Sequence, residues 1–305
     1  MKRVFSGLSG FAMVLLASFF IPLNAGAAGN PGILVDGQWL AAHNGKALVV
    51  DVRTDKEYMA GHIPGAINIP VSSLQGGPDA VPYTVKKEEK VLGAHGLAIN
   101  SDVVLYGSGN KDVFREFWIF DYLGMRNIHV LDGGIENWKG RPATEKEKTE
   151  LKPDQFTARP VLSKYATTSY VRAHLKKPGV ILLDARTPAE YHGAVAMALR
   201  GGHIPGAINI NFEENFQKNS TLFKSAGELK KLYASLDGRK EVIVYCQNGS
   251  RAVVAYFALR LLGFKKVRTY IPSWVEWGSN EGLPVAEVSY FNFVPVMKML
   301  KSAKK

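Results

Sequence analysis

The sequence predicts an α/β protein of two tandem domains, each a parallel sheet with helices on both faces. Two observations predict this fold. One ordered set of motifs occurs twice in the 305 residues, and in each copy short apolar, β-branched runs alternate with stretches of helical periodicity. Strands that alternate with helices form parallel sheets, because the crossover helices then cover the sheet faces.

The repeat begins with a strand that ends in aspartate. Residues 48–70 read LVVDVRTDKEYMAGHIPGAINIP, and residues 181–211 read ILLDARTPAEYHGAVAMALRGGHIPGAININ. The second copy carries an insertion, roughly residues 194–201, before its histidine. Further on, residues 102–107 match 241–246, the predicted helix 115–123 with its glycine matches 252–262 with its glycine, and residues 134–138 match 273–277.

The N-terminus predicts export. Lys2 and Arg3 precede an apolar run from Phe11 to Ile21, and a small-residue cleavage site ends at Ala27. The apolar run is too short for a membrane span, and no second candidate follows it. We therefore expect a signal peptide over residues 1–27, cleaved after Ala27, and a periplasmic or secreted mature chain without a transmembrane span.

The mature chain divides at a charged stretch that is bracketed by prolines. We predict a first domain over residues 28–142, an extended linker over 143–160, a second domain over 161–286 and a basic C-terminal tail over 287–305. Residues 290–305 mix lysines with apolar side chains. They would suit a terminal helix packed on the domain, or docking on a membrane or a partner.

Composition narrows the range of partners. The formal net charge is +11, or +9 without the signal peptide, but the lysines are scattered and no basic stripe alternates with aromatic residues. We therefore expect small anions as partners and no nucleic acid. The histidines are dispersed and only one cysteine is present, so we expect no metal site. No nucleotide-binding glycine motif occurs.

The single cysteine, Cys246, is the strongest functional signal. It follows an apolar strand over residues 242–245 and precedes a helix over 252–262 that ends at Gly263. Ligands of open α/β sheets bind at that strand edge. Helix N-terminal amides, a tight loop that Gly249 permits and the charge of Arg251 would together favour a thiolate. A buried, inert cysteine is the alternative, but the strand, the Cys-x-x-Gly-x-Arg spacing and the helix together favour a reactive thiol.

The two copies differ where chemistry is expected. Gly107 stands where Cys246 stands in the second copy, and Ser108-Gly109-Asn110-Lys111 offers no comparable nucleophile. We therefore predict one active site, in the second domain, with the first domain as a structural partner. Cysteines of exported proteins are usually paired in disulfides, but Cys246 has no second cysteine in this chain to pair with. We therefore interpret it as a working thiol.

These paired motifs closely resemble the tandem-domain rhodanese family, the thiosulfate and 3-mercaptopyruvate sulfurtransferases. The D-x-R-x-x-x-E-Y and G-H-I-P-G-A pairs, the C-Q-N-G-S-R loop and the S-W-x-E-W element span nearly the whole mature chain. The resemblance implies two rhodanese-like domains, of which only the C-terminal one is active. It also implies a ping-pong reaction, in which the Cys246 thiolate takes sulfur from a donor and passes it on from a persulfide to cyanide, a thiol or a protein acceptor.

The resemblance also implies roles for other residues. The amides of Gln247, Asn248, Gly249, Ser250 and Arg251 would hold the sulfur, and the Gln247 and Asn248 side chains would face the substrate. Arg186 would bind the anionic donor; its alternative is an ion pair with Glu190. Asp184 would order the loop and Trp274 would wall the site, or simply pack in the core. His203 is a candidate base, but its copy His62 lies in the domain without cysteine, which favours a structural role.

The donor stays open between thiosulfate and mercaptopyruvate. Basic residues inside the loop are typical of the thiosulfate enzymes and small residues of the mercaptopyruvate enzymes, and Gln247 and Asn248 fit neither pattern. Thiosulfate is slightly favoured because its dianion suits Arg251 and Arg186. A phosphatase or arsenate reductase, with a loop one residue longer, is an alternative enzyme class, and a persulfide sulfur carrier is the non-enzymatic alternative.

Overall fold

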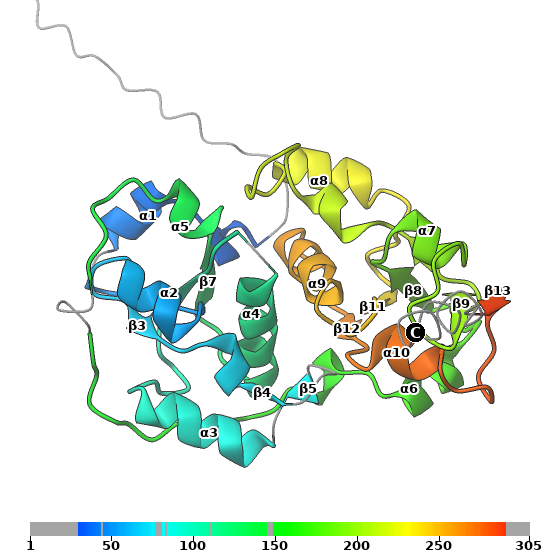
Figure 1. The fold of residues 1–305 in the computed structure, drawn as a ribbon, viewed down its shortest axis with the longest axis horizontal. Coiled ribbons are helices and arrows are strands. Elements are labelled where there is room, and N and C mark those ends of the chain that lie inside the picture. The colour runs from blue at the N-terminus through cyan, green and yellow to red at the C-terminus, as the bar shows by residue number, and fades with distance from the viewer. Residues whose placement is uncertain are drawn as a thin grey trace, which may run out of the picture.

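The computed structural model describes residues 30–43, 45–76, 81–82, 84–109, 111–144 and 149–290. The predicted signal peptide and residues 291–305 of the predicted tail lie outside these ranges. The described chain forms two α/β domains, the first drawn in blue to green and the second in green to red (Figure 1). None of the helices in this part of the chain is long and apolar enough to cross a membrane.

The first domain contains a five-stranded sheet in the order β1-β7-β6-β2-β3, and each neighbouring pair runs parallel. The strands are β1 (Leu34–Val35), β2 (Leu48–Asp51), β3 (Ile67–Asn68), β6 (Val103–Tyr106) and β7 (Ile128–Leu131). Helices α1 (Gly37–Ala42), α2 (Asp55–Ala60) and α5 (Gly134–Asn137) pack on one face, and α3 (Val85–Ala94) and α4 (Asp112–Leu123) on the other.

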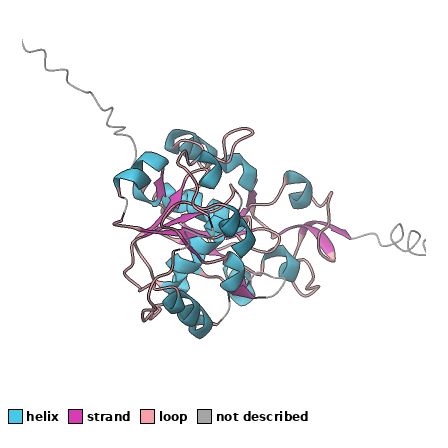
Figure 2. Cartoon of the chain, turned by 60° about the vertical axis from the view of Figure 1, so that its left-hand side comes forward, coloured by secondary structure: helices cyan, strands magenta, loops and turns pink. Residues whose placement is uncertain are grey.

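The second domain repeats this plan with four parallel strands in the order β10-β8-β11-β12. They are β8 (Val180–Asp184), β10 (Ile208–Asn209), β11 (Glu241–Tyr245) and β12 (Val267–Thr269). Helices α6 (Thr168–His174), α7 (Pro188–Tyr191) and α10 (Ser273–Trp277) pack on one face, and α8 (Ala226–Leu232) and α9 (Ala252–Leu261) on the other. Figure 2 shows strands in the interior with helices around them. The predicted fold class is confirmed.

The remaining short elements connect these layers. They are the 3₁₀ turns η1 (Pro31–Ile33), η2 (Val71–Ser73), η4 (Leu162–Lys164) and η5 (Phe212–Asn215), and the antiparallel pair β4 (Gln75–Gly76) and β5 (Val81–Pro82). The repeated threonine–glutamate spacing has a local purpose, because Thr54 with Glu57 and Thr187 with Glu190 form capping boxes that start α2 and α7.

The two domains share one hydrophobic core. Alternation along β11 places Val242, Val244 and Cys246 on the face that looks toward the first domain, where they belong to the same buried cluster as residues of α4 and α9. These two helices pack against each other (Figure 1), and the Phe117 and Phe257 rings meet edge to face at 4.9 Å. The cysteine therefore points into the domain junction.

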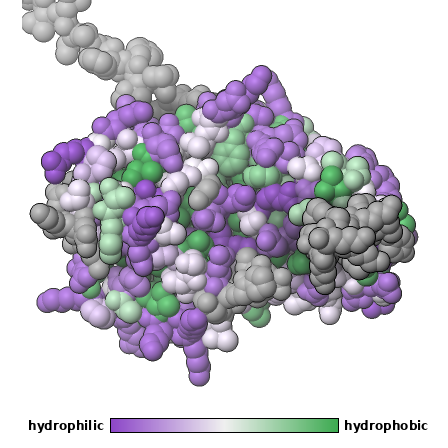
Figure 3. All heavy atoms as spheres, in the orientation of Figure 1, coloured by the Kyte–Doolittle hydropathy of each residue, from purple (hydrophilic) through white to green (hydrophobic). Residues whose placement is uncertain are grey.

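The insertion of the second copy builds an element that the first copy lacks. It leads into β9 (Arg200–His203), which pairs antiparallel with β13 (Ala286–Tyr290). Residues 287–290, which the sequence analysis assigned to the tail, thus form most of a strand, because the insertion supplies it with a pairing partner. Most of the molecular face in Figure 3 is hydrophilic. Of the six exposed large hydrophobic residues among the described residues, four lie on or beside this ribbon: Val195, Met197, Leu199 and Val288.

Candidate active site

Cys246 lies directly after β11, as the sequence predicts, and its side chain is fully buried and free of any disulfide. Register pairs Tyr245 with Asp184 on the neighbouring strand, so both residues stand at the carboxyl edge of the sheet. The loop from Gln247 to Arg251 then turns into α9. Cys246 therefore lies five residues before Arg251, the N-cap residue of α9.

The loop has unpaired donors. Within the described residues, the backbone N–H groups of Gln247, Asn248, Gly249 and Arg251 make no hydrogen bond, whereas the N–H of Ser250 donates to the Asn248 Oδ1 at 3.4 Å. Gly249 has φ of +83°, and a Cβ at this position would lie 2.9 Å from the Ile271 carbonyl oxygen. Such a run of free amides at a helix start suits an anion.

Arg251 closes the loop by an ion pair. Its Nη1 and Nη2 donate to the two carboxylate oxygens of Glu190 at 2.6 and 2.7 Å. Burial alone would lower the pKa of Arg251, but the hydrogen bonds to Glu190 and the charge of Cys246 raise it above the ordinary value. Arg251 therefore brings positive charge to the cysteine while it is anchored to α7.

Arg186 does not pair with Glu190, so that alternative is wrong. Its guanidinium binds the Asp184 carboxylate, at 2.6 Å from Nη2, and donates to the Gly202 carbonyl oxygen at 2.7 Å. It also lies over the Trp274 ring, 4.3 Å from the centroid. Arg186 and Trp274 are both buried. In the first domain Arg53 binds Asp51 in the same geometry, so the scaffold alone accounts for the Asp184–Arg186 contact.

His203 and its copy His62 also make equivalent contacts in the two domains. His203 stacks on Tyr191 at 3.8 Å, and its Nδ1 lies 3.0 Å from the Tyr191 carbonyl oxygen. His62 stacks on Tyr58 at 3.8 Å with the equivalent contact at 2.9 Å. Because the domain without cysteine has the same histidine–tyrosine contact, the comparison favours a structural role for His203. Among the described residues, no three His, Cys, Asp or Glu side chains are placed to hold a metal ion.

The sequence predicts that Ser273, together with Trp274, lies on the last loop of the second domain and walls the site. Ser273 begins α10, with φ of +54°, and its Oγ accepts a hydrogen bond from the Cys246 N–H at 3.1 Å and donates to the Tyr270 carbonyl oxygen at 2.7 Å. A positive φ is unfavourable for serine. The repeat contained the signal, because the matching residue in the first copy is Gly134, which needs no such compensation.

Arg115 is the residue that sequence reasoning missed entirely. It belongs to α4 of the first domain, is 2% exposed, and its Nη2 donates to the Asn248 carbonyl oxygen at 3.2 Å. Its Nη1 is buried without a hydrogen-bond partner in the described structure. Burial lowers the pKa of Arg115 to about 10, while the charges of Cys246 and Asp112 act in the opposite direction.

The signal for Arg115 was an arginine on an otherwise apolar helix face. Counting back from Gly124 and Gly263, the matching position on α9 holds Val254. A buried guanidinium costs free energy unless it faces a negative charge. The nearest group that can become anionic in the second domain is the sulfur of Cys246, because Arg115 reaches the loop that follows it.

The insertion covers the same loop from the other side. The Gln247 Nε2 donates to the Met197 carbonyl oxygen at 2.8 Å, and the Gln247 Oε1 is buried without a partner in this part of the chain. The Trp274 indole N–H donates to the Arg200 carbonyl oxygen at 2.9 Å, which ties β9 to α10. The Gln247 side chain therefore contacts the insertion, and the cysteine is closed off from solvent.

Fold and site together define a class: a two-domain α/β protein with one buried, free cysteine before a loop of unpaired amides at the domain junction. The family model described as the rhodanese-like domain matches the chain twice, over residues 36–141 and 167–280. The chain belongs to the rhodanese family.

Relatives agree over most of the chain. A thiosulfate sulfurtransferase of Corynebacterium glutamicum is 32% identical, with 84% of this chain and 91% of the relative covered. The sulfur carrier protein TtuD of Thermus thermophilus is 34% identical, with 85% and 98% covered. The crystal structure of an anaerobic ergothioneine biosynthesis enzyme from Chlorobium limicola has the same fold, with a TM-score of 0.76, 23% identity, and 83% of this chain and 70% of that chain covered. The sequence relatives support sulfur transfer as the general function.

Proposed function

We propose that the chain moves sulfane sulfur from thiosulfate to a thiophilic acceptor, cyanide or a thiol, through a persulfide on Cys246. The single observation that carries this proposal is the position of Cys246 before four free backbone donors. A loop of this kind stabilises an anionic sulfur, and covalent catalysis by an activated thiolate divides the transfer into two steps.

In the first step the Cys246 thiolate attacks the outer sulfur of thiosulfate. A sulfur–sulfur bond forms to the cysteine, the sulfur–sulfur bond of thiosulfate breaks, and sulfite leaves with the electron pair. In the second step cyanide attacks the outer sulfur of the persulfide, thiocyanate forms, and the cysteine sulfur keeps the electron pair. Neither step needs a proton or an external oxidant, which agrees with the absence of any acid or base hydrogen-bonded to the cysteine sulfur among the described residues.

Charge at the site supports this proposal. The outer sulfur of the proposed persulfide carries a negative charge, and two guanidinium groups, Arg251 and Arg115, interact electrostatically with Cys246. Arg251 is already neutralised by Glu190, whereas Arg115 keeps a buried N–H without a partner. We infer that the positive charge of Arg115 stabilises the persulfide anion. The first domain would then contribute a residue to the active site of the second.

The test is intact mass spectrometry of the mature protein after incubation with excess thiosulfate, with Cys246→Ser in parallel. We expect a gain of one sulfur atom, lost again on cyanide treatment and absent from the variant. No gain with thiosulfate but a gain with mercaptopyruvate would transfer the donor role to mercaptopyruvate. No gain with either donor would overturn the persulfide mechanism.

A sulfur carrier is the second candidate, and one observation favours it. The exposed hydrophobic side chains Val195, Met197, Leu199 and Val288 gather around the ribbon whose leading segment contacts Gln247. A partner protein that docks on this surface would stand next to the loaded cysteine. Steady turnover with cyanide or a small thiol would favour the enzyme, and loading without such turnover would favour the carrier.

A further inference from the structure

A second site lies at the far end of α9 from the cysteine. A cavity of about 710 Å³ is lined by the end of α4, by the connecting segment and by Arg260 in the last turn of α9. Arg260 lies eight residues after Ala252, the first residue of α9, which corresponds to a rise of roughly 12 Å along the helix. The volume is within the range of small-molecule sites, roughly 300–1,000 Å³. This cavity therefore belongs to the domain junction but not to the sulfur site.

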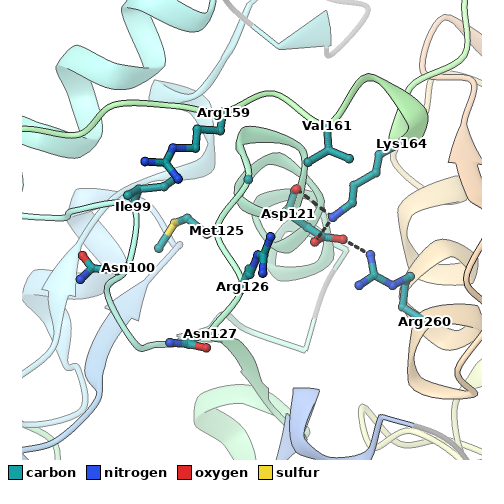
Figure 4. Close-up of a pocket in the computed structure, with 11 residues that line it drawn as sticks. Ile99, Asn100, Asp121, Met125, Arg126, Asn127, Arg159, Val161, Lys164 and Arg260 are labelled. Atoms are coloured by element: carbon teal, nitrogen blue, oxygen red, sulfur yellow. Dashed lines mark hydrogen bonds and ion pairs between the residues drawn. The ribbon is translucent and has the colours of Figure 1, made fainter.

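Its lining is strongly positive. Four cations, Arg126, Arg159, Lys164 and Arg260, surround one carboxylate, Asp121. Figure 4 shows Lys164 and Arg260 meeting Asp121 from two sides, with no interaction drawn to Arg126 or Arg159. The lining thus carries three more positive than negative charges.

The one carboxylate is already fully used. Besides the two cations, it accepts a hydrogen bond from the Tyr256 hydroxyl at 2.6 Å, and Lys164 also donates to the Asp121 carbonyl oxygen at 2.9 Å. Arg126 and Arg159 are exposed and have no ion pair or hydrogen bond from their guanidinium groups within the described structure. Burial lowers the pKa of Lys164, and the positive charges of Arg260 and Arg126 lower it further, against the effect of Asp121. The cations therefore repel one another across the cavity.

Helix dipoles explain only part of this charge. Helices α4 and α9 both end here, and a helix C-terminus favours nearby cations. That accounts for Arg126 and Arg260, which belong to these ends. It also accounts for Lys164, which donates to the Asp121 carbonyl oxygen in the last turn of α4. It leaves Arg159, which comes from the segment that connects the domains (residues 159–164) and whose guanidinium has no hydrogen bond or ion pair within the described structure. The charge of Arg159 therefore has no structural explanation in the helices.

The connecting segment is held firmly in place. The Arg159 N–H donates to the Leu123 carbonyl oxygen at 2.8 Å, and the Val161 N–H donates to the Tyr122 carbonyl oxygen at 2.7 Å. Gly124 has φ of +98°, and a Cβ there would lie 2.5 Å from the Arg159 carbonyl oxygen. The backbone that carries Arg159 is thus fixed against the end of α4 before any ligand arrives, which reduces the ordering cost of binding.

We propose that this cavity binds a compact polyanion with at least two tetrahedral oxyanion groups. Arg126 and Arg159 would bind one group through planar, paired N–H donors, and Lys164 and Arg260 would share their charge between Asp121 and the second group. Asn100 and Asn127, which also line the cavity, can donate through their side-chain amides. The ligand would contact both domains and the segment between them. Phosphates and sulfur oxyanions share this chemistry.

The test is isothermal titration calorimetry and thermal unfolding of the mature protein, in buffers adjusted with sodium chloride to one ionic strength. Inorganic triphosphate, pyrophosphate and dithionate are the probes, and sulfate is the monomeric comparison. We expect one site, a rise in melting temperature, and at least tenfold weaker binding of sulfate than of the best probe. Triphosphate or pyrophosphate alone would identify a phosphate site, and dithionate a sulfur oxyanion site.

The variant pair makes the test specific. Arg126→Gln with Arg159→Gln removes two exposed charges that line the cavity, and Lys265→Gln with Lys266→Gln removes two exposed charges outside it. We expect at least a tenfold loss of affinity in the first pair and less than a twofold loss in the second. Equal losses in both pairs, or no saturable binding of any probe, would overturn the proposal. The readout needs no sulfur transfer, so Cys246→Ser should bind like the wild type.

Discussion

The carboxyl ends of β6 in the first domain and β11 in the second have the same surroundings. In each domain a tyrosine at the strand end, Tyr106 or Tyr245, accepts a hydrogen bond from a backbone N–H at 3.1 Å, and an arginine binds the neighbouring aspartate at 2.6 Å. The next residue differs: Gly107 in the first domain and Cys246 in the second. The scaffold is therefore independent of the chemistry, and its repeated residues are poor guides to catalysis.

The residues that differ between the copies are better guides. Ser273 replaces Gly134 at a positive φ and binds the Cys246 N–H. Arg251 forms an ion pair with Glu190, whereas Glu57, the counterpart of Glu190, is exposed and forms no ion pair with an arginine of the described residues. Arg115, in the domain without cysteine, contacts the loop of the domain that has it. The first domain thus has a glycine at the position of the cysteine and places a positive charge beside the loop of the second domain.

The largest effect is expected from moving the thiol. Gly107→Cys in a Cys246→Ser background places a cysteine at the equivalent strand end of the first domain. We expect no mass gain with thiosulfate, because neither Arg251 nor Arg115 faces that strand end as they face Cys246. Intact mass spectrometry is the measurement, with Cys246→Ser alone as control. A gain of one sulfur atom would show that the scaffold alone activates a thiol.

Removing the charge from the first domain should have the next largest effect. Arg115→Gln takes away the buried guanidinium and should slow sulfur loading by about 100-fold, or ~2.7 kcal/mol, a typical cost for one donor aimed at a developing charge. Arg115→Lys should recover part of the rate. The measurement is the rate of mass gain in single turnover.

A second readout separates charge from packing. Loading should raise the melting temperature of the wild type, because the persulfide anion then faces Arg115, but it should not do so in Arg115→Gln. If the variant loads as fast as the wild type and gains the same stability on loading, Arg115 has only a packing role.

Ser273 should show a smaller effect. Ser273→Ala removes the acceptor for the Cys246 N–H and should slow loading by about tenfold, or ~1.4 kcal/mol. Ser273→Gly removes the same acceptor and also relieves the positive φ, so it should be as slow but about 1 kcal/mol more stable than the alanine variant. Single-turnover loading and urea unfolding measure the two quantities. A glycine variant with wild-type loading would reduce Ser273 to a packing residue.

The sequence alone was sufficient to predict those features of the fold and the site that are local in the chain or repeated in both domains. Apolar, β-branched runs and the duplicated motifs predicted the sheets, and the strand–loop–helix around Cys246 predicted the site because all its parts are neighbours in the chain. Arg115 was not predictable in this way. It comes from 131 positions earlier and reaches the loop only because α4 packs on α9, a tertiary contact that no local pattern encodes.

The partner of Arg186 illustrates a second limit. Spacing allowed Arg186 to reach either Asp184 or Glu190, and both choices place opposite charges close together. The structure pairs it with Asp184, and the guanidinium also binds the Gly202 carbonyl oxygen, just as Arg53 binds both Asp51 and the Gly61 carbonyl oxygen in the first domain. Side-chain partners within one cluster of charges depend on such third contacts, which sequence spacing does not give.

The smallest predicted effect depends on pH. Burial alone would raise the pKa of Glu190, but the hydrogen bonds and charge of Arg251, with Thr187, lower it below the ordinary value. Stability from the Arg251–Glu190 pair is therefore fully present above the ordinary carboxyl pKa near 4.3 and is lost as pH falls through the lower folded pKa. Glu190→Gln keeps the capping box and should cost about 1 kcal/mol at pH 7, with a smaller loss of stability from pH 5 to 3 than in the wild type.

The first domain offers the matched control for this comparison. Glu57 caps α2 through the same contact with Thr54, but it is exposed and lacks an arginine partner in the described structure. Its pKa is lowered mainly by the hydrogen bonds with Thr54, and Glu57→Gln keeps the capping box, as Glu190→Gln does, without leaving a buried guanidinium unpaired. We expect it to change stability at pH 7 by less than about 0.5 kcal/mol. Urea unfolding of both variants at pH 7, 5, 4 and 3 measures the difference. Equal losses in the two variants would mean that Arg251 gains nothing from Glu190, and the second domain's ion pair would then not distinguish the catalytic loop from its silent copy.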